Sequence, residues 1–226
     1  MLRIPQRSPF RGQVVTPPPL SLPIDHPGWR FFSDRVMGGV SDGEARVETV
    51  AGRRAIRLRG KVSLDHGGGF LQVACPLGTS SDPVFDASAL AGVELDVLGT
   101  SGAPGTYAVH LRTADTRAPW QVYVAPLPAE SGASAESNSE PEPNLEPEPN
   151  REPRPSLEPG SWRTVFLPWS AFHPQSLRLP LDPTRLRRVG LAASGAAFEA
   201  DLAVARIAFV AGDPSLQGRS RRAFPR

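Results

Sequence analysis

Apolar and polar side chains alternate with a period of two over much of the chain. Val93, Leu95 and Val97 are predicted to point inward and Glu94 and Asp96 outward, and several other short segments repeat this pattern. Such alternation is typical of antiparallel strands with one buried and one solvated face. No segment has an amphipathic helical pattern longer than about two turns. The sequence therefore predicts an all-β fold, an antiparallel jelly-roll-like β-sandwich of roughly ten short strands.

The predicted strands are separated by short runs of turn residues. Residues 44–50 and 54–60 are joined by Ala51-Gly52-Arg53, which predicts a β-hairpin. Further strands are expected at residues 69–75, 92–98, 107–113, 120–125, 162–167, 188–193, 197–202 and 204–210.

Residues 29–41 are interpreted as the opening strands, and they contain the glycine pair Gly38-Gly39. A glycine pair in a strand-like segment indicates a bulge, a bend or a close backbone approach. Asp34 and Ser41 are short polar side chains that can satisfy backbone groups left unpaired by such a kink. We expect Asp34 to hydrogen-bond the backbone of the glycine pair. The alternative is a calcium site with the ligands Asp34, Asp42, Glu44 and Asp65.

Composition divides the chain into one folded domain and three segments of low complexity. Residues 1–27 are proline-rich and lack periodicity, so we expect a disordered arm. A single β-sandwich domain is expected at residues 28–211, followed by a disordered basic tail at 212–226. Residues 129–160 interrupt the domain with Glu/Pro repeats that have almost no apolar side chains to bury. We interpret them as a disordered insertion; the alternative is a ligand for a proline-binding module.

Charge and cysteine content argue against several classes of function. The chain has 25 Lys and Arg residues against 23 Asp and Glu residues, a net charge near +2, so nucleic acid is not an expected partner. The single cysteine, Cys75, excludes an intrachain disulfide and a cysteine metal site, and its apolar surroundings predict a buried thiol. No apolar segment approaches the ~20 residues of a membrane-spanning helix, so no membrane span is expected.

The N-terminal segment bears on the compartment. It contains Arg3, Arg7 and Arg11 without an acidic residue, but the apolar region of a secretory signal peptide does not follow. Several prolines would break the amphipathic helix that an organellar transit segment needs. We therefore expect a cytoplasmic protein, with an organellar location as the alternative.

Nothing in the sequence indicates catalysis. The four histidines (His26, His66, His110 and His173) lie far apart, without the spacing of metal ligands. The glycines at residues 67–69 are not followed by the lysine and helix of a phosphate-binding loop. The serines lack the sequence context of a hydrolase nucleophile. We expect no catalytic residue, no metal site and no cofactor.

Aromatic residues provide the candidates for a ligand or partner surface. Trp120 and Tyr123 are candidates for a face on which a sugar could stack, and Arg112 is included in this candidate surface. Trp162 and Trp169 are instead expected to pack in the core or to close one end of the sandwich.

Several motifs occur in an order that resembles the complex I intermediate-associated protein 30 family. The most specific is Asp34-x-Val36-Met37-Gly38-Gly39-x-Ser41, followed by Gly68-Gly69-Phe70 and by weaker matches as far as residue 210. The resemblance implies a galactose-binding-like β-sandwich without catalytic activity. It also implies protein partners, since mitochondrial members of the family bind assembly intermediates of respiratory complex I. The motif residues are then the candidate structural or functional site: Asp34, Val36, Met37, Gly38, Gly39, Ser41, Gly68, Gly69 and Phe70.

These observations predict a non-catalytic, protein-binding module that resembles an assembly factor. Its expected partners are proteins, with respiratory or other membrane-complex assembly intermediates as the specific candidates. The alternative is a module that binds a carbohydrate or another small ligand.

Overall fold

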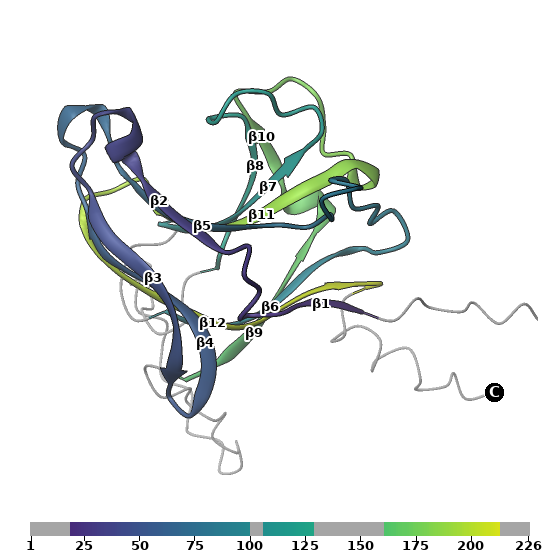
Figure 1. Ribbon diagram of the computed structural model, residues 1–226, viewed down its shortest axis with the longest axis horizontal. Helices are drawn as coiled ribbons and strands as arrows, with labels where there is room; N and C mark the ends of the chain where they lie inside the picture. Colours follow the sequence, from purple (N-terminus) through teal and green to yellow (C-terminus); the bar gives the residue numbers. More distant parts are fainter. Residues whose placement is uncertain (1–18, 100–105, 129–160, 213–226) are drawn as a thin grey trace, which may run out of the picture.

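Two antiparallel sheets packed face to face form the protein (Figure 1). The computed structural model describes residues 19–99, 106–128 and 161–212. Within these ranges the regular structure consists of twelve strands and four short 3₁₀ turns. The predicted all-β sandwich is therefore confirmed. No helix in the described ranges combines the length and the hydrophobicity that a membrane span requires.

The first sheet, sheet A, contains six strands. Their order is β3 (Asp42–Val50), β4 (Arg53–Val62), β12 (Phe198–Val210), β6 (Gly92–Gly99) and β9 (Arg163–Pro168), and β1 (Leu20–Leu22) also pairs with β12. β3 and β4 form the predicted hairpin, whose two-residue turn places Ala51 at φ 43° and Gly52 at φ 76°. Positive φ values at both turn residues match the right-handed twist of the flanking strands.

The second sheet, sheet B, also contains six strands. Their order is β10 (His173–Gln175), β8 (Val122–Pro126), β7 (Tyr107–Thr113), β11 (Leu186–Ser194), β5 (Phe70–Pro76) and β2 (Arg30–Ser33). The short turns are η1 (Asp34–Met37), η2 (Asp65–Gly67), η3 (Trp169–Ala171) and η4 (Pro183–Arg185).

Alternating side chains from both sheets fill the space between them. Val93, Leu95 and Val97 of β6 are fully buried in this core, as predicted. Burial of such a side chain stabilises the fold by about 1.5–3 kcal/mol. Glu94 and Asp96 point to the opposite face of sheet A, but they are only 5% and 9% exposed. They are covered because arginines lie over them: Glu94 is bonded to Arg206 and Asp96 to Arg53.

The C-terminal strand differs from its prediction. Residues 198–210 form one continuous strand, β12, where two strands were expected. Its register with β6 shifts between Val204 and Arg206, so Val204 and Ile207 both face the core. A bulge of one residue shifts the alternation of side chains by one position but does not end the strand. The interrupted alternation therefore predicted two separate strands.

The N-terminal boundary also differs, because residues 19–27 are part of the fold. β1 lies within the segment that was expected to be disordered, and it pairs with β12 through Leu20, Ser21 and Leu22. Leu22 and Ile24 pack against the core. Residues 1–18, the insertion at 129–160 and residues 213–226 of the tail lie outside the described residues, so the expected disorder there remains a prediction.

The connections after β2 and β4 position the most specific sequence motif. β2 belongs to sheet B and β3 to sheet A, and η1 lies between them; β4 belongs to sheet A and β5 to sheet B, and η2 lies between them. Both connections cross from one sheet to the other at the same corner, where Figure 1 shows the purple and blue turns together. Residues 29–41 therefore contain one strand, β2, followed by a crossover between the sheets, and not two opening strands.

Candidate functional site

Asp34 is the centre of this corner, which we call the signature corner (residues 33–41 and 63–70). Its side chain is fully buried, although a buried carboxylate is costly unless hydrogen bonds compensate it. Oδ1 accepts a hydrogen bond from the Ser41 backbone N–H at 2.9 Å. Oδ2 accepts from the Ser41 hydroxyl at 2.6 Å and from the backbone N–H groups of Gly69 at 2.5 Å and Phe70 at 3.4 Å. One carboxylate thus joins the two crossover connections.

Ser41 extends the network to the end of β4. Its hydroxyl oxygen accepts a hydrogen bond from the Ser63 backbone N–H at 3.0 Å while the hydroxyl proton is donated to Asp34. Ser63 was not among the predicted site residues, because the sequence gives no sign that its backbone would lie opposite Ser41.

The glycines of both motifs surround the Asp34 carboxyl group. A Cβ atom at Gly39 would lie 2.6 Å from Asp34 Oδ1, and a Cβ at Gly68 would overlap Oδ2. Gly38 has a different role, because it ends η1 at φ 92° with open space around its missing side chain. Gly39 and Gly68 therefore permit a close approach, whereas Gly38 permits a left-handed turn.

The hydrogen bonds at Asp34 differ from those expected. The carboxylate does not accept from the glycine pair; only the Asp34 carbonyl oxygen does so, from the Gly39 N–H at 3.0 Å. Burial by itself raises the pKa of Asp34, but the bonds from Ser41, Gly69 and Phe70 together hold the pKa below its ordinary value. The group is thus a buried, ionised acceptor.

The alternative calcium site is not assembled. Asp42 forms an ion pair with Arg35, Glu44 binds Arg46 and Arg59, and Asp65 accepts from Ser63. Across residues 19–99, 106–128 and 161–212, no three His, Cys, Asp or Glu side chains are arranged to hold a metal ion.

Four large apolar side chains are exposed on the outside of the signature corner. The exposed fractions are 74% for Val36, 58% for Met37, 42% for Val40 and 51% for Leu64. We call these four side chains the corner patch. Val36 and Met37 lie on η1, Val40 precedes β3, and Leu64 precedes η2. Val40 and Leu64 were not among the predicted site residues, although an apolar residue next to turn glycines was an available signal.

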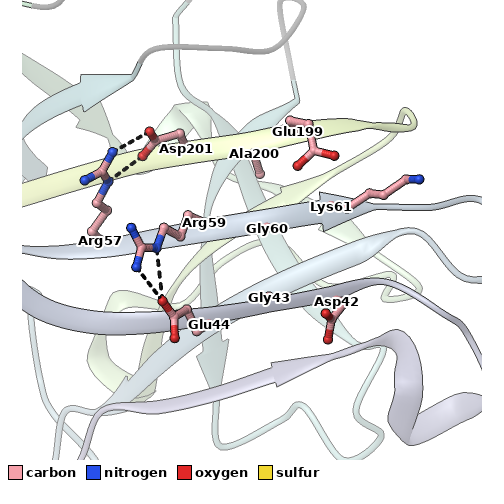
Figure 2. A pocket seen from close by; sticks show the side chains of 10 residues that line it. All are labelled: Asp42, Gly43, Glu44, Arg57, Arg59, Gly60, Lys61, Glu199, Ala200 and Asp201. Atoms are coloured by element: carbon pink, nitrogen blue, oxygen red, sulfur yellow. Dashed lines mark hydrogen bonds and ion pairs between the residues drawn. The ribbon is translucent and has the colours of Figure 1, made fainter.

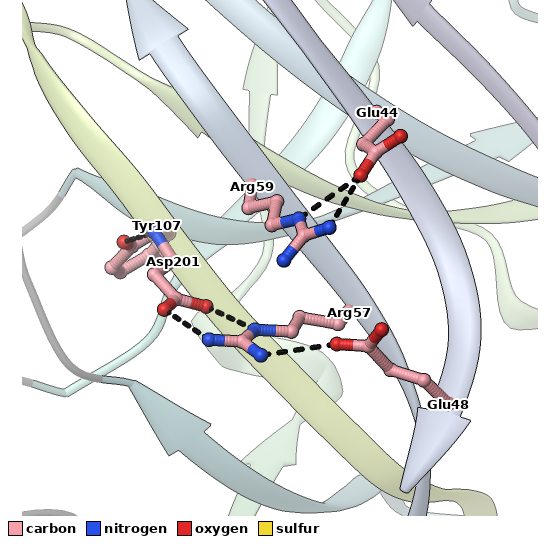
Figure 3. A network of polar contacts seen from close by, with 6 residues as sticks. All are labelled: Glu44, Glu48, Arg57, Arg59, Tyr107 and Asp201. Carbon is pink, nitrogen blue, oxygen red and sulfur yellow. Dashed lines mark hydrogen bonds and ion pairs between the residues drawn. The ribbon is translucent and has the colours of Figure 1, made fainter. Parts of the chain in front are cut away.

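A groove of about 850 Å³ crosses the outer face of sheet A (Figure 2). It lies over β3, β4 and β12, and its ten lining residues include no aromatic side chain. Arg59 binds Glu44 through Nε at 3.0 Å and Nη2 at 2.7 Å. Arg57 makes two parallel bonds to Asp201, at 2.7 and 2.6 Å, and a third to Glu48 at 3.0 Å (Figure 3).

These ion pairs engage every guanidinium nitrogen of Arg57 and two of the three in Arg59. The bonds from Asp201 and Glu48 raise the pKa of Arg57, so the guanidinium is held in its charged form. The Tyr107 hydroxyl oxygen accepts from the Asp201 backbone N–H at 2.8 Å and fixes that end of the network. A charged groove without an aromatic ring is not suited to stacking a sugar.

The predicted aromatic surface is not formed as a unit. Trp120 is 59% exposed in the connection between β7 and β8, but Tyr123 is only 1% exposed. Tyr123 packs in the core, and its hydroxyl donates to the Pro180 carbonyl oxygen at 3.2 Å. The inward face of β8 contains Tyr123, so this ring is a core residue and cannot share a face with Trp120. Arg112 is half-buried and donates to the Ala118 carbonyl oxygen at 2.9 Å.

Trp162 and Trp169 occupy structural positions. Trp169 packs against Phe172 and Phe209 at one end of the core, and its indole N–H donates to the Leu90 carbonyl oxygen at 2.7 Å. Trp162 lies under the Arg53 guanidinium, which is 5.0 Å from the ring centroid, on the outer face of sheet A.

Cys75 and His26 form a pair of titratable groups that the sequence did not predict. The Cys75 sulfur lies 3.2 Å from His26 Nδ1, which also accepts from the Gly28 backbone N–H at 2.9 Å. Since Nδ1 is the acceptor, the thiol keeps its proton and donates. Burial raises the pKa of Cys75 to about 11, and the side chain is fully buried. The pair therefore lacks the thiolate that a cysteine nucleophile requires.

Comparisons with known proteins agree with this architecture. The sequence model for complex I intermediate-associated protein 30 (CIA30) matches residues 20–139, and no curated protein matches the chain in sequence. A family 11 carbohydrate-binding module from Clostridium thermocellum, solved with a β-1,3-1,4-mixed-linked tetrasaccharide, is similar in structure. It is 11% identical, with a TM-score of 0.56, over 85% of this chain and 95% of the module.

The corresponding module of the cellulosomal cellulase Lic26A-Cel5E, also from Clostridium thermocellum, is similar as well. It is 11% identical, with a TM-score of 0.53, over 82% of this chain and 88% of the module. At this identity the likeness shows a shared galactose-binding-like β-sandwich fold.

Proposed function

Because the chain belongs to the complex I intermediate-associated protein 30 family, we propose that it is a non-catalytic module that binds a protein partner. In this role it assists the assembly or the stability of a protein complex. Assembly intermediates of a respiratory complex are the partners that the family description favours.

The observation that carries this proposal is the corner patch. Val36, Met37, Val40 and Leu64 expose apolar surface to water at one corner, where burial against a partner would be favourable. The Asp34 network holds the backbone beneath them in place. A patch on a fixed backbone loses little conformational entropy when it binds, so more of the contact energy appears as affinity.

The chemistry of the described residues supports a non-catalytic role. The Cys75–His26 pair is buried and protonated at sulfur, and Asp34 has all its hydrogen bonds within the protein. The arginines of the groove on sheet A are bonded to carboxylates. None of these groups presents an activated nucleophile or base to a substrate.

Affinity purification from the native cell tests the proposal directly. We expect the wild-type protein to recover subunits of a respiratory assembly intermediate. The double variant Val36→Ser, Met37→Ser should recover at least about tenfold less, because apolar anchors dominate such interfaces. Leu179→Ser is the matched control, since Leu179 is 59% exposed elsewhere on the surface.

The outcomes separate the two parts of the proposal. Both variants should keep the wild-type circular dichroism spectrum, because the substituted side chains are exposed. If the double variant still recovers the partner, the corner patch is not the binding surface. If the wild-type protein recovers no respiratory subunit, the respiratory assignment is wrong.

A second candidate is carbohydrate binding, for which exposed Trp120 is the specific observation. A single exposed indole can stack on a sugar ring, and the connection between β7 and β8 presents it to solvent. A glycan array would show binding that Trp120→Ala removes. An array without a hit would exclude this candidate and leave the protein-binding proposal intact.

A further inference from the structure

A second pocket, of about 320 Å³, lies at one end of sheet B, where β5 and β7 end and β11 begins. Four of its lining residues are arginines: Arg112 on β7, Arg117 in the following connection, and Arg187 and Arg188 on β11. We call it the basic pocket. Its volume is near the lower end of the range for small-molecule sites, so it is suited to a compact ligand and not to a polymer.

A β-bulge brings two of these arginines to the same side of the strand. The register between β11 and β7 shifts so that Leu186 pairs with Thr113 and Arg188 with Arg112. Leu186 and Val189 are both buried in the core, and the two arginines between them are exposed. Regular alternation would have directed one of the two toward the core, so the bulge is what gathers them.

The arrangement concentrates like charges. Arg188 lies directly opposite Arg112 across the strands, and like charges in such a pair repel each other. Burial and the charges of Arg188 and Arg187 lower the pKa of Arg112. Arg112 remains in place because it donates to neutral oxygens, those of Thr116 and Ala118.

Within the described residues, no carboxylate compensates this charge. None of Arg112, Arg117, Arg187 and Arg188 forms an ion pair with a described acidic residue. Asp115, in the connection that also contains Arg117, is bonded to Arg185 at 2.8 Å. The guanidinium donors of Arg187 and Arg188 are therefore available to a ligand.

We propose that the basic pocket binds a phosphate group, either as inorganic phosphate or as the phosphomonoester of a small molecule. One arginine can satisfy a monovalent carboxylate, whereas several convergent guanidiniums suit an oxyanion that carries up to two charges. A bound phosphate would relieve the repulsion between Arg188 and Arg112 and would accept hydrogen bonds from both strands. This site is independent of the corner patch and of the proposed protein partner.

Isothermal titration calorimetry at constant ionic strength provides the test. Inorganic phosphate and glycerol 3-phosphate are the two probes, and acetate and sulfate are the competing anions. We expect saturable phosphate binding that Arg188→Gln and Arg187→Gln each weaken by about tenfold, the loss typical of a charge-assisted hydrogen bond. The control is Arg54→Gln, which removes the same charge from an exposed position on β4.

Each result supports or overturns the proposal. Tighter binding of glycerol 3-phosphate assigns the site to an organic monoester, and equal or tighter binding of inorganic phosphate assigns it to the free ion. Equal losses in Arg188→Gln and Arg54→Gln would show non-specific attraction and overturn the site. Tighter binding of acetate, or no saturable binding by the folded wild-type protein, would overturn the phosphate assignment.

Discussion

At the signature corner one buried carboxylate is surrounded by donors, whereas in the basic pocket four guanidiniums form no ion pair with a carboxylate of the described residues. Asp34 accepts from Ser41, Gly69 and Phe70, and its bonds are closed within the protein. Arg187 and Arg188 make no side-chain hydrogen bond to another described residue. The Asp34 carboxylate therefore stabilises the fold, whereas the guanidiniums of Arg187 and Arg188 are available to bind a ligand.

The groove on sheet A shows that charge density alone does not distinguish these roles. Arg57 and Arg59 also line one pocket together, but each is bonded to a carboxylate on an adjacent strand. In the groove, arginines face carboxylates on the adjacent strands, whereas in the basic pocket Arg188 faces another arginine, Arg112. The comparison therefore predicts that substitutions at the corner affect stability and that substitutions in the basic pocket affect binding.

The largest effect is expected for Asp34→Asn. The asparagine side chain keeps one oxygen but places an NH₂ group against the N–H donors that face Oδ2. We expect the free energy of unfolding to fall by about 3 kcal/mol, because several buried donors lose their charged acceptor. Urea denaturation followed by circular dichroism measures this loss.

Asp42→Asn is the matched control for that substitution. Asp42 is exposed and forms a surface ion pair with Arg35, so its loss should have little effect on unfolding. If both variants unfold at the same urea concentration, the Asp34 network does not hold the two crossovers together.

Gly39→Ala is expected to destabilise the fold less than Asp34→Asn does. Gly38→Ala should destabilise it less than Gly39→Ala. The new Cβ at position 39 would lie 2.6 Å from Asp34 Oδ1 and would displace the carboxylate, at a cost of about 2 kcal/mol. At position 38 the Cβ meets open space, and only the φ of 92° is unfavourable, at a cost of about 1 kcal/mol. Thermal unfolding of the two variants checks the order. The reverse order would mean that the turn, not the close approach, requires the glycine pair.

The pH dependence of stability follows from the lowered pKa of Asp34. A carboxylate whose pKa is lower in the folded state stabilises the fold above its ordinary pKa, near pH 4, and loses that contribution as the pH falls further. We expect the wild-type protein to lose more stability than Asp34→Asn as the pH falls from about 5 to about 2. Urea unfolding of both proteins at each pH measures the difference. Parallel curves would show that folding does not lower the pKa of Asp34.

The sequence predicted most of the fold because the period of two survives wherever strands are regular. It predicted the inward face of β6 from alternation, and the β3–β4 hairpin from alternation together with the short turn at residues 51–53. It failed at β12, where a bulge at Ala205 divides the pattern, and at β1, whose three residues are too short for a recognisable period. In both places, pairing with a neighbouring strand determines the structure, and pairing is not visible along one strand.

The candidate site was predicted only in part, because its contacts join residues that lie far apart in the sequence. The motif residues were identified by resemblance, but the bonds from Asp34 to Gly69 and Phe70 span 35 and 36 positions. Tyr123 was expected on the surface because alternation in residues 120–125 does not say which face is inward. Arg187 and Arg188 look like ordinary polar positions in the sequence; only the bulge opposite Arg112 makes them a cluster.

The smallest change in the free energy of unfolding is expected for Arg188→Gln. This variant tests whether the arginines of the basic pocket, unlike Asp34, contribute little to stability. In phosphate-free buffer this substitution should leave the free energy of unfolding unchanged within about 0.5 kcal/mol, because it removes a repelling charge and breaks no ion pair. Arg57→Gln should instead lower it by about 1 kcal/mol, because Asp201 and Glu48 lose their shared partner. Urea denaturation at low salt measures both changes. Phosphate should then stabilise the wild-type protein more than Arg188→Gln, since a ligand that binds only the folded state shifts the unfolding equilibrium. A loss in Arg188→Gln equal to that in Arg57→Gln would show that both arginine clusters are structural, and the distinction between paired and unpaired charge would not hold.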